Sequence, residues 1–174
     1  MSTHKEIELH KAVLYERLPN NRAKCNVCQR RCNIAEDKVG ICLTRVNKGG
    51  DIYSTIYGIV SSMAADPIEK KPVYHYLSGT NCFSVGSFGC NFRCVFCQNW
   101  EIAYADGTQI PAVAGHRLTP QQAVQLALDY NCKSISWTYN EPAIWLEYTL
   151  DCAKLAKEHG FRTVYVTNGY ITPE

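Results

Sequence analysis

Long apolar runs are absent from this sequence, and so is a large excess of charge of either sign. No apolar stretch approaches the roughly 20 residues that a membrane-spanning helix needs. The 18 basic and 16 acidic side chains leave a formal net charge of +2, which argues against a surface that binds nucleic acid or another polyanion. Residues 1–10 are polar and lack the apolar core of a signal peptide. These absences predict a soluble, cytoplasmic protein that binds neither membrane nor nucleic acid.

Cysteine, by contrast, is abundant, with ten residues among 174. In a small secreted protein such a number would indicate disulfide bonds. Here no export signal is present, and seven of the ten lie in two tight groups, within residues 25–42 and within residues 90–97. Close cysteine groups in a cytosolic chain favour metal sites over disulfides.

The first part of the chain predicts a short helix over residues 9–18 and a β-hairpin. Two alternating stretches, residues 41–47 and 51–57, flank the turn sequence Lys48-Gly49-Gly50 and predict the hairpin. Residues 25–42 are expected to form a loop, and residues 66–79 an irregular connection. We place a boundary near its end, between a cysteine-rich N-terminal segment, 1–79, and a second domain, 80–174.

The second domain alternates strands with helices. The expected elements are a strand at 82–88, a helix at 120–130, a strand at 134–138, a helix at 143–159 and a strand at 161–167. Thr119 and Gln122 form a capping box around Pro120, and Gly160 is a natural end for the second helix. The order predicts an α/β fold with parallel strands and right-handed crossovers. Three such strands cannot close a barrel, so we expect a truncated chain, or else a half-barrel that a partner chain completes.

The strongest chemical signal is the sequence CNFRCVFC, in which Cys90, Cys94 and Cys97 have the spacing C-x3-C-x2-C. Iron–sulfur clusters are usually held by four cysteine thiolates, so three leave one iron of a [4Fe–4S] cluster open for chemistry. The loop follows a predicted strand, where active sites of β/α barrels form. A zinc site or free thiols are the alternative, although zinc would need a fourth ligand and this spacing is unusual for it.

This motif, with the βαβαβ order, resembles the radical S-adenosylmethionine (SAM) superfamily. The wider sequence GCNFRCVFCQNWEIA, preceded by DPIEKKPVYHYLSGT, is similar to the AmmeMemoRadiSam-system radical SAM proteins, often labelled pyruvate formate-lyase activating enzyme-like. The resemblance implies that residues 80–174 are the N-terminal half of a TIM-like (β/α)6 barrel. It also implies that Phe96 packs near the SAM adenine, whereas the plain alternative is an aromatic that anchors the loop.

The resemblance points to further SAM contacts at the ends of the second and third strands. Tyr139-Asn140-Glu141-Pro142 stands where the superfamily has a GGE-type stretch; the glycines are absent, but Asn140 and Glu141 offer acceptors for the SAM amino group. Glu141 is alternatively an ordinary helix N-terminal charge. Thr167 and Asn168, with Gly169, are expected near the SAM carboxylate or ribose, or else form a simple turn. Gln98, Asn99 and Trp100 either support the cluster or belong to a plain loop.

By resemblance, the cluster reductively cleaves SAM to a 5′-deoxyadenosyl radical that abstracts hydrogen from a substrate. The implied partners are SAM, an electron donor such as a flavodoxin or ferredoxin, and a protein substrate if the reaction is like that of a glycyl-radical enzyme activase. A small-molecule substrate is an alternative. A hypothesis of another class is a metal-binding interaction module without turnover.

The first cysteine group has the spacing C-x2-C-x3-C-x9-C. Its members are Cys25, Cys28, Cys32 and Cys42. Four thiolates suit zinc or a second iron–sulfur cluster, and unligated thiols are the alternative. Arg30 and Arg31 within the group are expected to be solvated surface charges. Cys82, Cys132 and Cys152 are expected to be core thiols, and the lone His75 receives no role.

Overall fold

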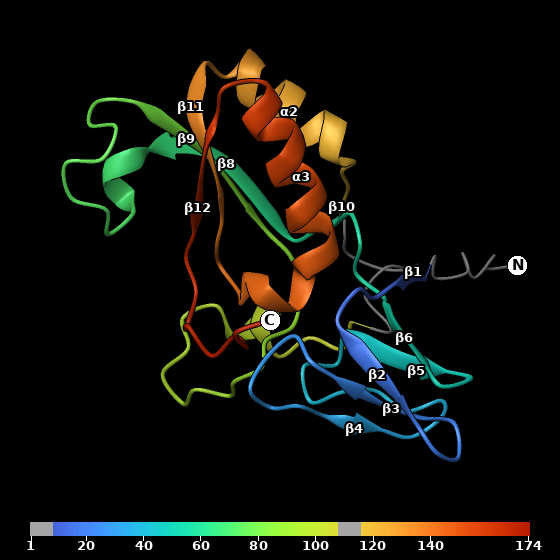
Figure 1. Ribbon diagram of the computed structural model, residues 1–174. Coiled ribbons are helices and arrows are strands. Elements are labelled where there is room, and N and C mark those ends of the chain that lie inside the picture. Colours follow the sequence, from blue (N-terminus) through green and yellow to red (C-terminus); the bar gives the residue numbers. More distant parts are fainter. Residues whose placement is uncertain (1–8, 108–115) are drawn as a thin grey trace, which may run out of the picture.

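The computed structural model describes residues 9–107 and 116–174. A central sheet with two helices on one side forms the larger part of the protein, and short N-terminal strands form a smaller part beside it (Figure 1). Among the described residues, no helix combines the length and apolar character needed to cross a membrane.

The central sheet has the strand order β12-β11-β9-β8. Its strands are β8 (Ser62–Pro67), β9 (Asn81–Gly86), β11 (Cys132–Trp137) and β12 (Arg162–Tyr165), and its crossovers contain α2 (Pro120–Asp129), the 3-10 helix η3 (Pro142–Trp145) and α3 (Leu146–Glu158). β9, β11 and β12 are parallel, as the sequence predicts. β8 is antiparallel to β9 and comes from the N-terminal side of the expected boundary. The described sheet is open, and no closed barrel is present in this part of the chain.

The predicted start of the first crossover helix is confirmed. The Thr119 hydroxyl accepts a hydrogen bond from the Gln122 amide, the Gln122 side chain accepts one from the Thr119 amide, and Pro120 begins α2. Because these contacts are local in sequence, the pattern of residues alone identifies them.

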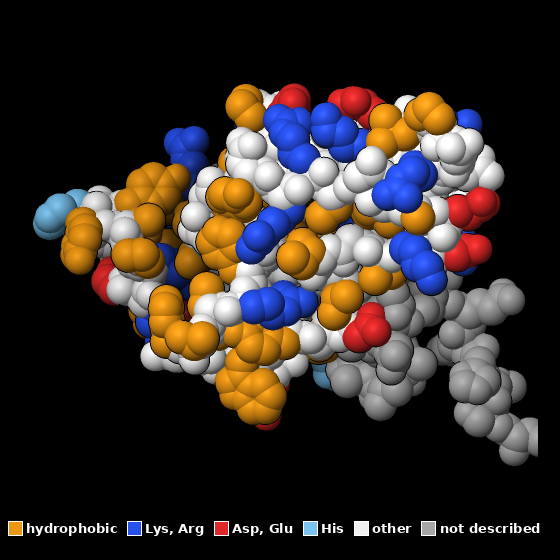
Figure 2. All heavy atoms as spheres, turned by 90° about the horizontal axis from the view of Figure 1, so that it is seen from below, with side chains coloured by type: hydrophobic (Ala, Val, Ile, Leu, Met, Phe, Trp, Pro, Cys, Tyr) orange, Lys and Arg blue, Asp and Glu red, His pale blue; other side chains and the backbone are white. Residues whose placement is uncertain are grey.

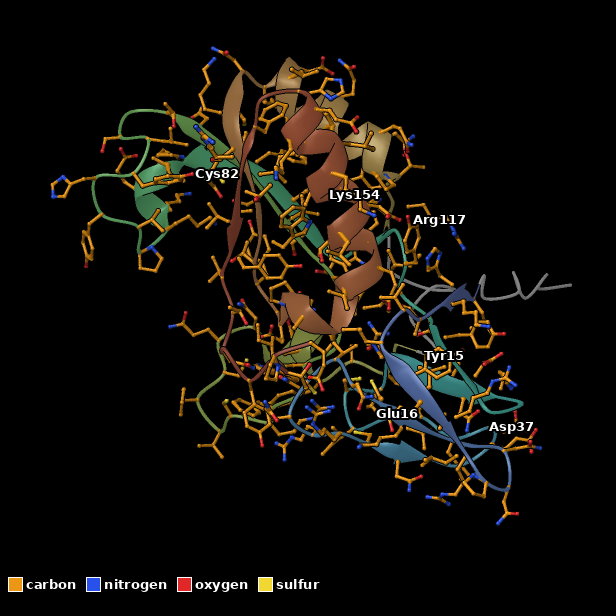
Figure 3. All side chains as sticks on the ribbon, in the orientation of Figure 1. Tyr15, Glu16, Asp37, Cys82, Arg117 and Lys154 are labelled. Atoms are coloured by element: carbon orange, nitrogen blue, oxygen red, sulfur yellow. The ribbon has the colours of Figure 1, made fainter. Side chains whose placement is uncertain are left out.

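The two faces of the sheet differ in chemistry. Phe83, Val85, Ile135 and Trp137 are buried in one apolar core together with Tyr148 of α3. Strand alternation turns the intervening residues to the opposite face, and these include the fully buried Ser84, Ser134 and Ser136. Cys82, Cys132 and Cys152 are buried as expected, and Cys82 lies within the sheet (Figure 3).

The N-terminal part contains two three-stranded sheets. Its strands are β1 (His10–Lys11), β2 (Tyr15–Leu18), β3 (Arg22–Cys25), β4 (Asn33–Ile34), β5 (Arg45–Lys48) and β6 (Asp51–Ser54). The predicted hairpin is confirmed as β5 and β6, with Lys48 opposite Asp51 across a two-residue turn. Gly49 and Gly50 both have positive φ, at 61° and 84°, which is the backbone that such a turn requires.

The predicted helix over residues 9–18 is wrong, because this segment forms β1 and β2. β1 pairs with the distant β6, with His10 opposite Ser54, whereas β2 forms a hairpin with β3, the next strand along the chain. Tyr15 and Arg17, two positions apart on β2, both reach the Asp51 carboxylate, which a strand permits and a helix does not. Tertiary contacts therefore override the local preference.

The remaining elements are short. They are β7 (Ile59–Val60), η1 (Ile68–Lys70), α1 (Trp100–Ala103) and β10 (His116–Arg117), of which β7 and β10 pair with each other. A buried ion pair joins the two parts, since Arg45 of β5 contacts Glu147 of α3 at 2.7 Å.

Candidate functional site

The three cysteines of the C-x3-C-x2-C motif lie in the loop between β9 and α1, at the carboxyl end of β9 (Figure 1). Gly89 allows the loop to leave the strand, because its φ is +83° and a Cβ there would lie 2.4 Å from the Thr44 side chain and 2.7 Å from the Cys42 carbonyl oxygen. A turn closes the motif, with the Cys97 amide donating to the Cys94 carbonyl at 2.9 Å.

These three cysteines share one cavity with the ends of β11 and β12. The cavity has a volume of about 330 Å³. It is lined by Cys90, Phe92, Cys94, Cys97, Asn99, Ala103, Thr138, Tyr139, Asn140, Glu141, Val166, Thr167 and Asn168. The structure therefore brings together the cysteines and four of the five residues that the sequence assigned to SAM. The carboxyl ends of parallel strands are where such folds bind ligands.

Phe96, the fifth of these residues, stands apart. Its side chain is 82% exposed, and it does not line the cavity. Val95 of the same loop and Trp100 at the start of α1 are also exposed. Viewed from below, the molecule presents hydrophobic side chains interspersed with Lys and Arg (Figure 2). Of the three residues after the motif, Asn99 contacts the site, since it donates to the Tyr139 carbonyl at 2.8 Å.

Glu141 is buried and ties two strand ends together. Its Oε1 accepts hydrogen bonds from the Ala143 amide at 2.9 Å and from the Thr167 hydroxyl at 2.7 Å, and its Oε2 accepts one from the Asn168 amide at 2.8 Å. A carboxylate has about four acceptor sites, so this one retains about one for a ligand. The Ala143 contact is the helix-capping role that the sequence offered as the alternative.

Asn140 fastens the start of the cysteine loop. Its Oδ1 accepts from the Ser87 amide at 3.0 Å, and its Nδ2 donates to the Gly89 carbonyl at 2.9 Å. Both ends of the side chain are thus engaged with the chain that leads into Cys90. Asn140 positions the loop in this structure.

Asn91 is a site residue that the sequence reasoning missed. It is 1% exposed, and its Oδ1 accepts from Asn168 Nδ2 at 2.8 Å, which joins the cysteine loop to the end of β12. Its Nδ2 is buried without a hydrogen-bond partner among the described atoms. The available signal was its position next to Cys90, because a buried amide beside a metal ligand is suited to contact the bound group.

Arg30 also contacts this loop. It is exposed, as expected, but its Nε donates to the Asn91 carbonyl at 3.0 Å, and its guanidinium lies over the Phe92 ring. Arg31 instead binds Asn26 and Glu174. Neither contact can be read from local sequence, because each partner is supplied by folding.

The donor set of the loop fits an iron–sulfur cluster. Burial raises the pKa of the Cys90 thiol, and the Phe92 amide, 3.4 Å from its sulfur, opposes that rise. Within residues 9–107 and 116–174, no three His, Cys, Asp or Glu side chains are arranged around a single ion. A [4Fe–4S] cluster offers each thiolate its own iron, so three ligands need not meet at one ion.

The four cysteines of the first group also lie around one pocket. Cys25, Cys28, Cys32 and Cys42 line one small pocket together with Arg45. This pocket and the larger cavity have different lining residues. His75 is exposed and lines neither of them.

Comparison with known proteins identifies the family of the chain. The family model described as the radical SAM superfamily matches residues 84–174, which run from within β9 to the last residue of the sequence. The uncharacterized protein MJ0808 of Methanocaldococcus jannaschii is 42% identical over 166 residues, which cover 95% of this chain and 49% of that protein. The chain thus spans about half the length of this relative. No solved structure matches the chain. With its cysteine loop, strand ends and more than half of its length within the matched region, the chain belongs to the radical SAM superfamily.

Proposed function

We propose that Cys90, Cys94 and Cys97 hold a [4Fe–4S] cluster and that the adjoining cavity binds SAM. The observation that carries the proposal is the shared cavity, in which three thiols face the polar ends of two neighbouring parallel strands. Its volume of about 330 Å³ falls within the range of roughly 300–1,000 Å³ typical of small-molecule sites. The chemistry that such a cluster would supply, once reduced by one electron, is transfer of that electron to the SAM sulfonium, with cleavage of the S–C5′ bond into methionine and a 5′-deoxyadenosyl radical.

In this proposal the residues of the chain bind the cluster and orient SAM. The thiolates of Cys90, Cys94 and Cys97 would hold three irons and leave the fourth for SAM. The remaining acceptor site of Glu141 and the second Nδ2 hydrogen of Asn168 are available to the amino acid moiety of SAM, whereas the Thr167 hydroxyl already donates to Glu141 and supports that carboxylate. The buried Asn91 Nδ2, which lacks a partner among the described atoms, can donate to a sulfur of the cluster.

The finer assignments rest on sequence similarity alone. We assign the chain to the AmmeMemoRadiSam-system proteins within the superfamily. The reaction is hydrogen abstraction from a substrate; if the enzyme acts like an activase, that substrate is a glycyl residue of a partner protein. A reduced flavodoxin or ferredoxin is the electron donor. Similarity to an activase is an argument from family and not from the site.

The experiment is anaerobic reconstitution of the chain with iron and sulfide. We expect about four irons per chain, an electron paramagnetic resonance spectrum of the reduced protein that changes on addition of SAM, and 5′-deoxyadenosine by mass spectrometry. Cys94→Ala removes one ligand, whereas Cys132→Ser, in the core away from the cavity, is the matched control. Iron that binds normally while its spectrum ignores SAM would favour the metal-binding module without turnover.

A further inference from the structure

The first cysteine group forms a second buried pocket of its own. Cys25, Cys28 and Cys42 are 6–8% exposed. A Cβ added at Gly40 would lie 3.8 Å from the sulfurs of both Cys32 and Cys42, so these two side chains point toward one place. The Cys25 amide donates to the Cys32 carbonyl at 2.9 Å, which fixes the backbone between them. Four thiols that are up to 17 positions apart in sequence thus face one space.

Arg45 provides independent evidence of a ligand in this pocket. It is 1% exposed and lines the pocket, and its terminal nitrogens bind Glu147. Its Nε is buried without a partner among the described atoms. A buried donor without an acceptor is unfavourable, and a thiolate sulfur in the pocket would provide one. Arg31 also lines the pocket, and its charge is paired with Glu174.

The donors that line the pocket favour zinc. The lining contains no His, Asp or Glu, and four thiolates with no open position are a closed, structural zinc set.

We propose that Cys25, Cys28, Cys32 and Cys42 bind one structural zinc ion. The four sulfurs are not arranged around a single ion in the described residues. Binding therefore requires the cysteine side chains to turn inward between staggered rotamers. The spacing of the four residues and their common pocket make this a local movement.

The zinc site braces the loop that carries the other cysteines. Arg30, between Cys28 and Cys32, donates to the Asn91 carbonyl at 3.0 Å, and Arg93 donates to the Ile41 carbonyl at 3.2 Å. The Cys42 carbonyl packs against Gly89. Zinc would therefore hold the platform on which the C-x3-C-x2-C loop rests, whether or not that loop binds a cluster.

The test is metal analysis of the 174-residue chain. In a variant with Cys90, Cys94 and Cys97 all replaced by alanine, we expect about one zinc per chain and no iron above background. Zinc should be lost from a Cys25→Ser, Cys28→Ser variant and retained by Cys132→Ser, a buried thiol outside the pocket. Because zinc content does not depend on SAM cleavage, failure here and failure of the proposed function are distinguishable.

Cobalt provides a second measurement on an unaltered first cysteine group. Replacing zinc with Co²⁺ in the triple-alanine variant should give the intense thiolate-to-cobalt charge-transfer absorption and the visible bands of a tetrahedral sulfur site. Iron with sulfide in that variant would overturn the proposal in favour of a second cluster, and so would a metal-free chain with free or disulfide-bonded thiols. These outcomes decide the question even if the Cys25→Ser, Cys28→Ser variant does not fold.

Discussion

The hydroxyl of Thr167 donates a 2.7 Å hydrogen bond to the buried carboxylate of Glu141 and thereby connects the ends of two neighbouring parallel strands. The next residue, Asn168, donates its amide to the other oxygen of the same carboxylate. Asn168 in turn reaches the cysteine loop through Asn91. The carboxyl edge of the sheet is thus a continuous polar network, and Glu141 is its centre.

Glu141→Gln should destabilise the protein by about 1–3 kcal/mol, because the new amide nitrogen has to face one of the three donors that the carboxylate now accepts. Urea unfolding at neutral pH measures the change. Glu158→Gln, at the exposed end of α3, is the control and should alter the free energy of unfolding by less than about 0.5 kcal/mol. Equal stability of the two variants would contradict the role given to Glu141.

Asp51 should make stability depend on pH. Hydrogen bonds from Arg17, Tyr15 and Lys11 hold the pKa of its carboxyl well below the ordinary value of 3.8. A lowered folded-state pKa stabilises the fold at pH values above 3.8, and this stabilisation is lost as the pH falls below 3.8 toward the lowered value. The urea midpoint should therefore decline as the pH is lowered from about 5, most steeply below 3.8, and it should decline less in Asp51→Asn.

Asp37→Asn is the control for that experiment. Asp37 lies at the outer edge of the N-terminal strands (Figure 3), and its side chain is 67% exposed in an ion pair with Lys48. This variant should follow the pH profile of the parent protein. If the urea midpoints of the parent protein and of Asp51→Asn declined equally as the pH fell, Asp51 would not be the group that makes stability depend on pH.

The parallel strands and their crossovers could be predicted because their signals are local. The capping box before α2 and the glycine after α3 are contiguous in sequence, and the cavity follows from the rule that parallel strands share a carboxyl edge. The strand at Tyr15–Leu18 was missed although its hairpin partner, Arg22–Cys25, is close in sequence, and the turn residues Pro19-Asn20-Asn21 between them were a local signal. Its contact with Asp51 is distant and could not be read from the local sequence.

The same distinction applies within the site. The cysteines have a spacing of their own, so the sequence located them, whereas the roles of Asn91 and Arg30 depend on contacts 77 and 61 positions away. Glu141 was assigned to SAM by motif position, and the structure adds three protein donors that a motif does not reveal. Non-local hydrogen bonds are therefore what the sequence reasoning lacked.

The buried Arg45–Glu147 pair should be strongly coupled. Burial by itself would raise the pKa of Glu147, but the charge and hydrogen bonds of Arg45 outweigh it and leave this pKa lowered. Glu147→Gln leaves the guanidinium buried without a counter-charge and should cost about 3–5 kcal/mol in urea unfolding. The double variant Arg45→Met, Glu147→Leu should lose much less unfolding free energy than the sum of the losses in Arg45→Met and in Glu147→Leu.

The exposed pair of Lys48 and Asp37 is the reference for the buried pair. Their side chains are 50% and 67% exposed, so breaking this pair should cost less than about 1 kcal/mol. If Glu147→Gln were no more destabilising than Asp37→Asn, the interface between β5 and α3 would not depend on this ion pair.

Gly89→Ala should disrupt the approach to the cysteine loop. A Cβ at this position would lie 2.4 Å from Thr44 Cγ2 and 2.7 Å from the Cys42 carbonyl oxygen, and the backbone has a φ of +83°. Gly160 has a similar φ of +77° with nothing within 4 Å of its Cβ position, so Gly160→Ala measures the backbone strain alone. The steric clash should make Gly89→Ala less stable than Gly160→Ala by about 1–3 kcal/mol. Because Gly89 directly precedes Cys90, relief of the clash should also shift that ligand, so Gly89→Ala should lower the iron bound after anaerobic reconstitution, whereas Gly160→Ala should bind as much iron as the parent protein. Equal effects of the two alanines on stability and iron would mean that the two cysteine loops are not packed against each other at Gly89.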